Sequence, residues 1–216
     1  ATSVEAYQQQ GFLPEALLNY LALLGWSLDG ETTVFSSDTL KENFGFDRIS
    51  RNPAVFDETK LTWMNSAYIK AMGASFFVDA WLPYLQEVGF TRNGDTLLDA
   101  SGALLSGTPA TVEEVDADVI TNRCWYEAIY PLVAERAKKL DEVNAMTAFL
   151  FSGDKVFYDE KSVEKCLRKP GIDKVLTRCL DELANEDMLW QHAELEEALR
   201  SLPEQLDLKP KVVFQA

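Results

Sequence analysis

Residues 11–27 read GFLPEALLNYLALLGWS, and this stretch predicts one short helix with both of its ends marked. Pro14 suits the first helical position, because that position has no intrahelical hydrogen bond for a proline to remove. Glu15 then lies in the first turn, where the helix dipole favours a negative charge. Gly25 stands where a left-handed residue would end the helix. The stretch therefore predicts a helix from Pro14 to Leu24.

Helix-start signals recur along the chain, whereas alternation of apolar and polar residues at period two is scarce. Capping-box spacings at residues 2–5 and 111–114 each predict a helix N-terminus. Asp57 is a good N-cap for a further helix that runs to Gly73. We therefore predict an all-α fold.

Three further features refine this prediction. Four leucines within residues 97–105, at positions 97, 98, 104 and 105, suggest another helix, which is broken near the turn residues 106–109. Pro83 and Pro131 each fall inside a helical pattern and are expected to kink or split it, because proline removes an intrahelical hydrogen bond. A change from mixed turns and short helices to a denser run of helices places a domain boundary near residues 73–75.

The balance of charge argues against nucleic-acid binding. The chain has 216 residues, a formal net charge of −15 and a sequence pI near 4.5. Affinity for nucleic acids depends mainly on neutralising phosphates with lysine and arginine. Local charge still counts for more than the total, so a groove lined by a few basic residues can bind RNA on an acidic protein.

The sequence also predicts a cellular compartment. No apolar run is long enough to span a bilayer, and the N-terminus lacks the basic and apolar regions of a signal peptide. The chain has three cysteines, an odd number that lacks the spacing of a zinc site: Cys124, Cys166 and Cys179. We expect reduced, mostly buried thiols in a cytoplasmic protein.

Two stretches of the sequence closely resemble the glutamyl-tRNA synthetases, a family of class I ligases. Residues 11–27 resemble the segment that follows the signature lysine loop of the family. Residues 56–69 read FDETKLTWMNSAYI and match the pattern FD-x-x-KL-x-W-x-N-x-x-YI. The resemblance implies a tRNA stem-contact domain over residues 1–74 and an α-helical anticodon-binding domain over 75–216, which stops before the final helical bundle of the family.

The family activates glutamate with ATP and Mg²⁺ and attaches it to tRNA(Glu), but this chain lacks the motifs for that chemistry. His192 is the one histidine, so no His-x-Gly-His motif is present, and neither a Lys-x-Ser-Lys loop nor a glycine-rich phosphate loop occurs. We therefore expect no catalytic, cofactor-binding or metal-binding residue here. The expected partners are tRNA(Glu) and the catalytic domain of the same polypeptide, and neither a membrane nor DNA.

Four polar residues of the first predicted domain are candidate contacts with the tRNA stem: Arg48, Arg51, Lys60 and Asn65. An arginine can bind a phosphate with two parallel hydrogen bonds, but two solvated loop charges would give the same pattern. Lys60 and Asn65 lie in the second matched stretch, whose helix is beside the tRNA in the family. Asn65 could equally cap a joint between helices. The neighbouring Leu61, Trp63, Tyr68 and Ile69 are expected in the core.

The resemblance also suggests a contact with the anticodon. Residues 135–142 read ERAKKLDE and resemble the family segment whose arginine reads an anticodon base. Arg136 would occupy that position, because its planar side chain can donate two hydrogen bonds to one splayed base. Lys138 and Lys139 would add contacts to the RNA backbone. The other interpretation of Arg136 is a solvated charge on a helix face.

A second function from another class fits the same sequence. The chain could be a helical protein-interaction module that descends from a synthetase and has lost its RNA role. A clustered basic face would favour tRNA binding, whereas scattered basic residues and a large exposed apolar patch would favour protein interaction.

Overall fold

The structure is a computed structural model that describes residues 3–50, 54–99, 103–153, 155–185 and 189–214. Contacts divide the chain into two compact units, residues 1–157 and residues 158–216. The predicted boundary at residues 74/75 lies inside the first of these units, and the division into a stem-contact domain and an anticodon-binding domain stays a prediction.

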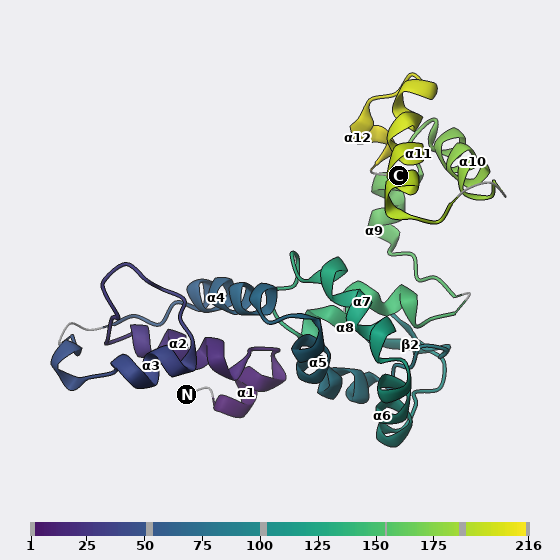
Figure 1. Cartoon of the computed structure of the whole chain (residues 1–216). Helices are drawn as coiled ribbons and strands as arrows, with labels where there is room; N and C mark the ends of the chain where they lie inside the picture. The colour runs from purple at the N-terminus through teal and green to yellow at the C-terminus, as the bar shows by residue number, and fades with distance from the viewer. Residues whose placement is uncertain (1–2, 51–53, 100–102, 154, 186–188, 215–216) are drawn as a thin grey trace. The chain divides into compact units, whose positions relative to one another are not determined.

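The first unit is a set of packed helices (Figure 1). Within it, α2 packs against α3 and α4, and α5 packs against α6, α7 and α8. Its α-helices are α1 (Val4–Gln9), α2 (Pro14–Leu23), α3 (Ser37–Asn43), α4 (Glu58–Ala71), α5 (Ala74–Val88), α6 (Val112–Thr121), α7 (Arg123–Val133) and α8 (Asp141–Thr147). Two 3₁₀ turns, η1 (Phe46–Arg48) and η2 (Ala148–Leu150), complete its helical part.

Helix ends follow the local signals in the sequence. Pro14 is the first residue of α2, as predicted. The Asp57 side chain accepts hydrogen bonds from the first-turn N–H groups of α4. Thr111 and Glu114 form the predicted capping box of α6. Ser3 caps α1, while residue 2 lies outside the described residues. The all-α prediction is therefore confirmed, with one short exception.

That exception is a small hairpin where a helix was expected. Strand β1 (Leu97–Leu98) pairs antiparallel with β2 (Leu104–Ser106). The intervening residues 99–103 read DASGA, and aspartate, serine and glycine are poor helix formers. Leu98 is buried in the core, so tertiary packing also favours the extended conformation here. The helix predicted over residues 97–105 was wrong.

Neither proline breaks its helix. Helix α5 continues through Pro83, and α7 contains Pro131 and ends two residues later. Burial of Phe77, Trp81 and Leu85 on one face of α5 offsets the hydrogen bond lost at the proline. The break falls instead at Asn122, between α6 and α7, where the Asn122 amide donates to the Asp118 carboxylate at 2.7 Å.

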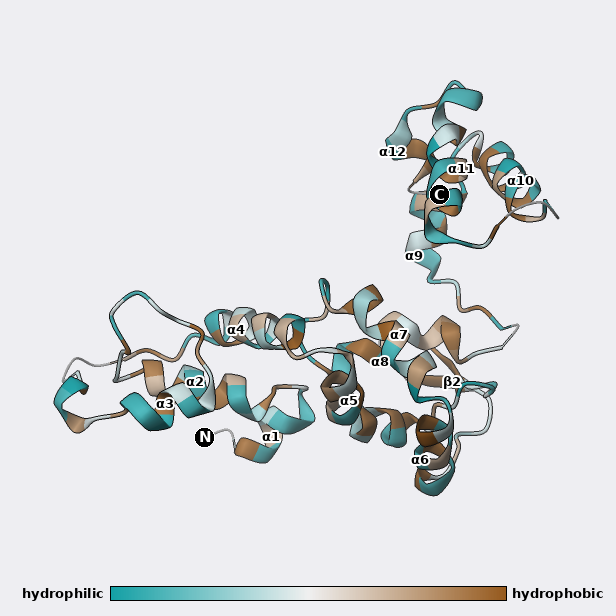
Figure 2. Cartoon of the chain, viewed as in Figure 1, coloured by the Kyte–Doolittle hydropathy of each residue, from teal (hydrophilic) through white to brown (hydrophobic). Residues whose placement is uncertain are grey.

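One hydrophobic core extends across residues 73–75. Leu13 and Ile69 precede residues 73–75 and belong to this core. They share it with three aromatic residues that follow residues 73–75: Trp81, Tyr126 and Phe151. Figure 2 shows hydrophobic stretches on α5 and α7, which contribute to this core. Helices α4 and α5 thus belong to one packed body.

The second unit is smaller. It contains α9 (Glu160–Ser162), the π-helical turn η3 (Val163–Leu167), α10 (Ile172–Leu183), α11 (His192–Gln205) and α12 (Pro210–Val213). Val175, Leu202 and Val213 form its small core. Hydrophilic and hydrophobic turns alternate along α10 in Figure 2, as expected for a helix with one buried face.

Two sequence predictions concern properties of the whole chain. All three cysteines are free thiols, but Cys124 is exposed on α7 and the other two are half-buried, so the prediction of mostly buried thiols was wrong. In the part of the chain that the structure describes, each helix is too short or too polar to span a bilayer.

Candidate tRNA interface

Asn65 lies inside the first unit, at a joint between three segments of backbone. Its side chain has no exposed area. The carbonyl oxygen accepts from the Leu13 N–H at 2.8 Å, and the amide donates to the carbonyls of Gly11 and Lys138 at 3.3 and 2.7 Å. The structure therefore favours the interpretation of Asn65 as a joint between helices, because its polar atoms are bonded within the protein and no part of it faces solvent.

Gly11 completes this joint. Its φ is +80°, which favours glycine, and its carbonyl accepts from the Leu140 N–H at 2.9 Å. A Cβ atom at residue 11 would lie 2.5 Å from the backbone nitrogens of Leu140 and Asp141. We call Gly11, Leu13, Asn65, Lys138 and Leu140 the Asn65 joint. It holds the segment that follows α7 against helix α4.

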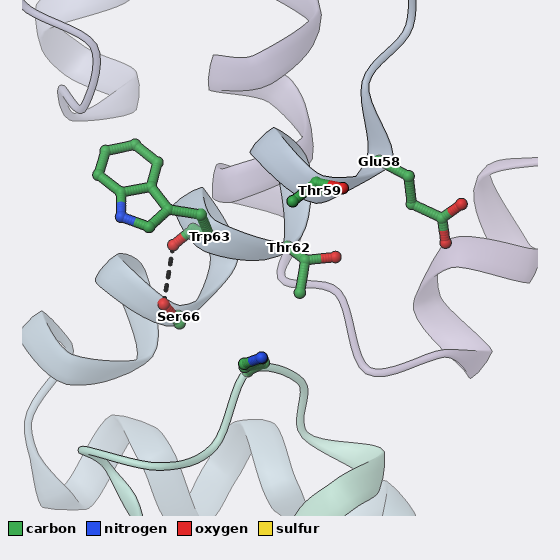
Figure 3. A pocket seen from close by; sticks show the side chains of 6 residues that line it. Glu58, Thr59, Thr62, Trp63 and Ser66 are labelled. Carbon is green, nitrogen blue, oxygen red and sulfur yellow. Dashed lines mark hydrogen bonds between the residues drawn. The ribbon is translucent and has the colours of Figure 1, made fainter.

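The joint creates a pocket beside α4. The pocket has a volume of about 470 Å³ and is lined by Glu58, Thr59, Thr62, Trp63, Ser66 and Lys138. Figure 3 shows how these α4 side chains lie, with the Ser66 hydroxyl donating to the Trp63 carbonyl at 2.8 Å. Lys138, a candidate contact for the anticodon, therefore lies close to the helix that carries Lys60, a candidate contact for the stem.

Trp63 departs from the sequence prediction. Leu61 and Ile69 are fully buried and Tyr68 is half-buried, but 52% of Trp63 is exposed. The buried face of α4 includes Leu61, Met64 and Ile69, and position 63 falls on the opposite side of a helix with 3.6 residues per turn. The predicted core position of Trp63 was wrong, and the sequence signal that could have shown this is its helical phase.

Lys139 differs from its neighbour Lys138. Its ammonium lies 3.4 Å from the Asp141 carboxylate and 6.0 Å from the centre of the Phe12 ring. Burial raises the pKa of Asp141, while the nearby Lys139 charge acts in the opposite direction. Lys139 thus helps to balance a partly buried carboxylate. The Lys138 side chain remains exposed, and its backbone N–H donates to the Glu142 carboxylate at 3.1 Å.

The remaining stem candidates lie on exposed parts of the first unit. Arg48 ends the turn η1 and donates to the Leu28 carbonyl at 2.6 Å, which holds its side chain across the preceding loop. Lys60 is exposed in the first turn of α4. Arg51 lies outside the described residues.

Arg136 is exposed, but it does not lie on a helix. Helix α7 ends at Val133, and the Arg136 N–H donates to the Val133 carbonyl at 2.9 Å in the following turn. The interpretation of Arg136 as a charge on a helix face therefore needs correction, because the chain turns toward the Asn65 joint at this point. Its neighbour Glu135 forms a salt bridge with Lys70 of α4 at 2.8 Å.

Comparison with known proteins places these elements in a family. The family model described as the anticodon binding domain matches residues 77–216. The model described as the catalytic domain of class I tRNA synthetases (E and Q) matches residues 1–63.

Individual relatives agree with the family models. The glutamate–tRNA ligase of Moorella thermoacetica is 34% identical to this chain over 94% of its residues. The glutamate–tRNA ligase of Desulforudis audaxviator is also 34% identical to it, over 85% of its residues. The chain spans 36% and 32% of the length of these two proteins.

A glutamate–tRNA ligase of Elizabethkingia meningosepticum, whose crystal structure contains its amino acid, has a similar fold. The two structures superpose with a TM-score of 0.65 and share 20% sequence identity. The match covers 97% of this chain and 35% of the Elizabethkingia protein. The chain thus belongs to the glutamate–tRNA ligase family, and its residues 77–216 match the anticodon-binding domain.

Proposed function

We propose that this chain is the tRNA-recognition region of a glutamate–tRNA ligase, and that the whole protein joins glutamate to tRNA(Glu) with ATP and Mg²⁺. The match of residues 77–216 to an anticodon-binding domain carries the proposal. The relatives that match most of this chain are named glutamate–tRNA ligases, which supports tRNA(Glu) as the partner.

The exposed basic side chains of the first unit support two kinds of RNA contact. Arg48 and Lys60 would bind phosphates of the stem, since both residues are exposed, and the exposed Lys138 would add a contact to the RNA backbone at the anticodon. Arg136 would donate to the edge of an anticodon base, because unpaired bases offer hydrogen-bonding edges that a double helix hides. Asn65 takes no part in this surface, and its proposed role is to position Lys138.

The chain itself would supply no chemistry. It lacks both sequence motifs that position ATP in class I synthetases. Its residues therefore do not fit an ATP site, and we assign ATP and Mg²⁺ to the rest of the protein. We expect this chain to give no glutamate-dependent exchange of pyrophosphate into ATP. Exchange above the rate without glutamate would contradict the proposed division of labour.

An apolar surface was the feature expected to favour the alternative function of protein interaction. Several apolar side chains between α3 and α4 are exposed, among them Phe46 and Val55, at 84% and 85%. This segment lies within the region that matches the catalytic-domain model, so we assign it to contacts within the ligase. The match to an anticodon-binding domain favours RNA over a separate protein partner.

The direct test is equilibrium binding of this chain to labelled tRNA transcripts, followed by fluorescence anisotropy. We expect binding of a tRNA(Glu) transcript and weaker binding of transcripts whose anticodon alone has been changed. Equal affinity for all anticodons would remove the anticodon contact from the proposal. No binding of any transcript at low salt would overturn the function.

A further inference from the structure

The second unit carries a cationic face that the sequence motifs did not reveal. The face consists of four basic residues on α9, η3 and the turn after it: Lys161, Lys165, Arg168 and Lys169. They are spaced four, three and one residues apart. All four side chains are exposed, whereas Val163, Cys166 and Leu167 between them are half-buried. This periodicity places the charges on the outer side of the segment and the apolar groups on its inner side.

This segment is locally basic, whereas the chain as a whole has a net charge of −15. Residues 161–169 contain four basic side chains and one acidic side chain, a net charge of +3, and two acidic residues, Asp159 and Glu160, precede them. Among the described residues, Lys161, Lys165 and Lys169 form no salt bridge. Arg168 pairs with Glu164 at 2.6 Å. Both members of that pair are 63% exposed, and such surface pairs contribute little to stability, so they exchange readily for another anion.

We propose that this cationic face binds the phosphate backbone of the tRNA, and this inference rests on the proposed function. The chemistry favours phosphate over an apolar partner, because lysine ammonium groups act as point charges for phosphate oxygens and no large apolar side chain is exposed among these residues. Phosphate contacts position RNA without reading its sequence. The second unit would therefore strengthen binding equally for every anticodon.

The test compares two variants of the 216-residue chain that change the net charge by the same amount. The first replaces the face: Lys161→Gln, Lys165→Gln and Lys169→Gln. The control replaces three exposed lysines elsewhere: Lys41→Gln, Lys209→Gln and Lys211→Gln. Affinity for the tRNA(Glu) transcript is measured over a range of salt concentrations. Circular dichroism checks that both variants keep the helical content and melting temperature of the parent chain.

Loss of three phosphate contacts should lower the slope of log Kd against log salt by about 2, at about 0.7 per contact with single-stranded RNA. If the variant and the parent chain have the same Kd at 1 M salt, this difference in slope makes binding by the variant roughly hundredfold weaker at 0.1 M salt. The control should retain the slope of the parent chain within about 0.5. Restoring charge with Lys161→Arg, Lys165→Arg and Lys169→Arg should restore both the slope and the affinity.

Each other outcome overturns the inference. An unchanged slope in the first variant would show that the face does not contact phosphate, while tRNA binding by the parent chain would still support the proposed function. Equal losses in both variants would show an effect of total charge and not of this face. If the parent chain bound no tRNA, the proposed function and the inference would fail together.

Discussion

Replacing Asn65 tests how the first unit is held together. In Asn65→Ala, the Leu13 N–H loses its hydrogen-bond acceptor inside the core, and the Lys138 carbonyl loses its donor. The Gly11 carbonyl keeps its bond from Leu140. A buried donor without a partner costs about 1–3 kcal/mol, and a partly buried carbonyl that water can reach costs about 1 kcal/mol.

The expected loss of stability is therefore about 2–4 kcal/mol for Asn65→Ala. For a domain of this size, this corresponds to a melting temperature lower by about 6–12 °C. Differential scanning calorimetry measures the shift. A matched control is Asn43→Ala, which removes an exposed amide that donates to the Thr39 carbonyl at 2.8 Å. We expect the control to shift the melting temperature by less than about 2 °C.

A second substitution separates the hydrogen bonds from the packing. Asn65→Asp keeps an acceptor for the Leu13 N–H but turns oxygen atoms toward the Gly11 and Lys138 carbonyls. Burial would raise the pKa of this new carboxyl, so the folded state would bind a proton more tightly than the unfolded state. Its stability should therefore increase as the pH falls from 7 to 5. A shift below 2 °C for Asn65→Ala, or no pH dependence for Asn65→Asp, would refute the assignment of this joint.

Three further predictions concern single residues. Gly11→Ala should destabilise the chain by more than about 2 kcal/mol, because the φ of residue 11 is positive and the new Cβ would approach the Leu140 nitrogen. Urea unfolding measures this loss of stability, and a neutral effect would contradict the prediction. Burial raises the pKa of Tyr68 to about 12, above its unfolded value, so the stability from its hydroxyl is present below about pH 10 and lost as the pH rises through 12. Tyr68→Phe should accordingly be less stable at pH 8, with a difference that narrows above pH 10, and a constant difference would count against this pKa. Arg136→Ala should weaken tRNA binding by about 1–3 kcal/mol in an anticodon-dependent manner, whereas Arg48→Ala should weaken binding of all tRNAs alike. If anisotropy titrations show that Arg136→Ala loses the same affinity for every anticodon, Arg136 is a phosphate contact.

The sequence predicted best what depends on neighbouring residues. Asp57 and Thr111 mark helix starts through hydrogen bonds that span three residues or fewer, and Pro14 does so through its fixed φ and missing N–H, so the local pattern was sufficient. The hairpin of β1 and β2 escaped prediction because its leucines are apolar in either conformation, and burial of Leu98 in the core decides between them.

The candidate site depended more on tertiary structure. Asn65 is polar within an apolar helix pattern, and sequence alone left it as either a tRNA contact or a joint. Its bond to the Lys138 carbonyl spans 73 positions of sequence, which no local pattern reveals. The same joint brings Lys138 to α4 and thereby forms the pocket beside Trp63. The charges of residues 161–169 were visible in the sequence, but their shared exposure required the structure.

Hydroxyl-radical footprinting of a tRNA(Glu) transcript bound to this chain shows which parts of the tRNA the protein covers. We expect protection of riboses in the anticodon loop and along one side of a stem, at protein concentrations that match the measured affinity. Protection of the anticodon loop should weaken in Arg136→Ala, while protection of the stem remains. A transcript that shows no protection at saturating protein, or protection spread evenly over all helices, would contradict tRNA recognition by this region.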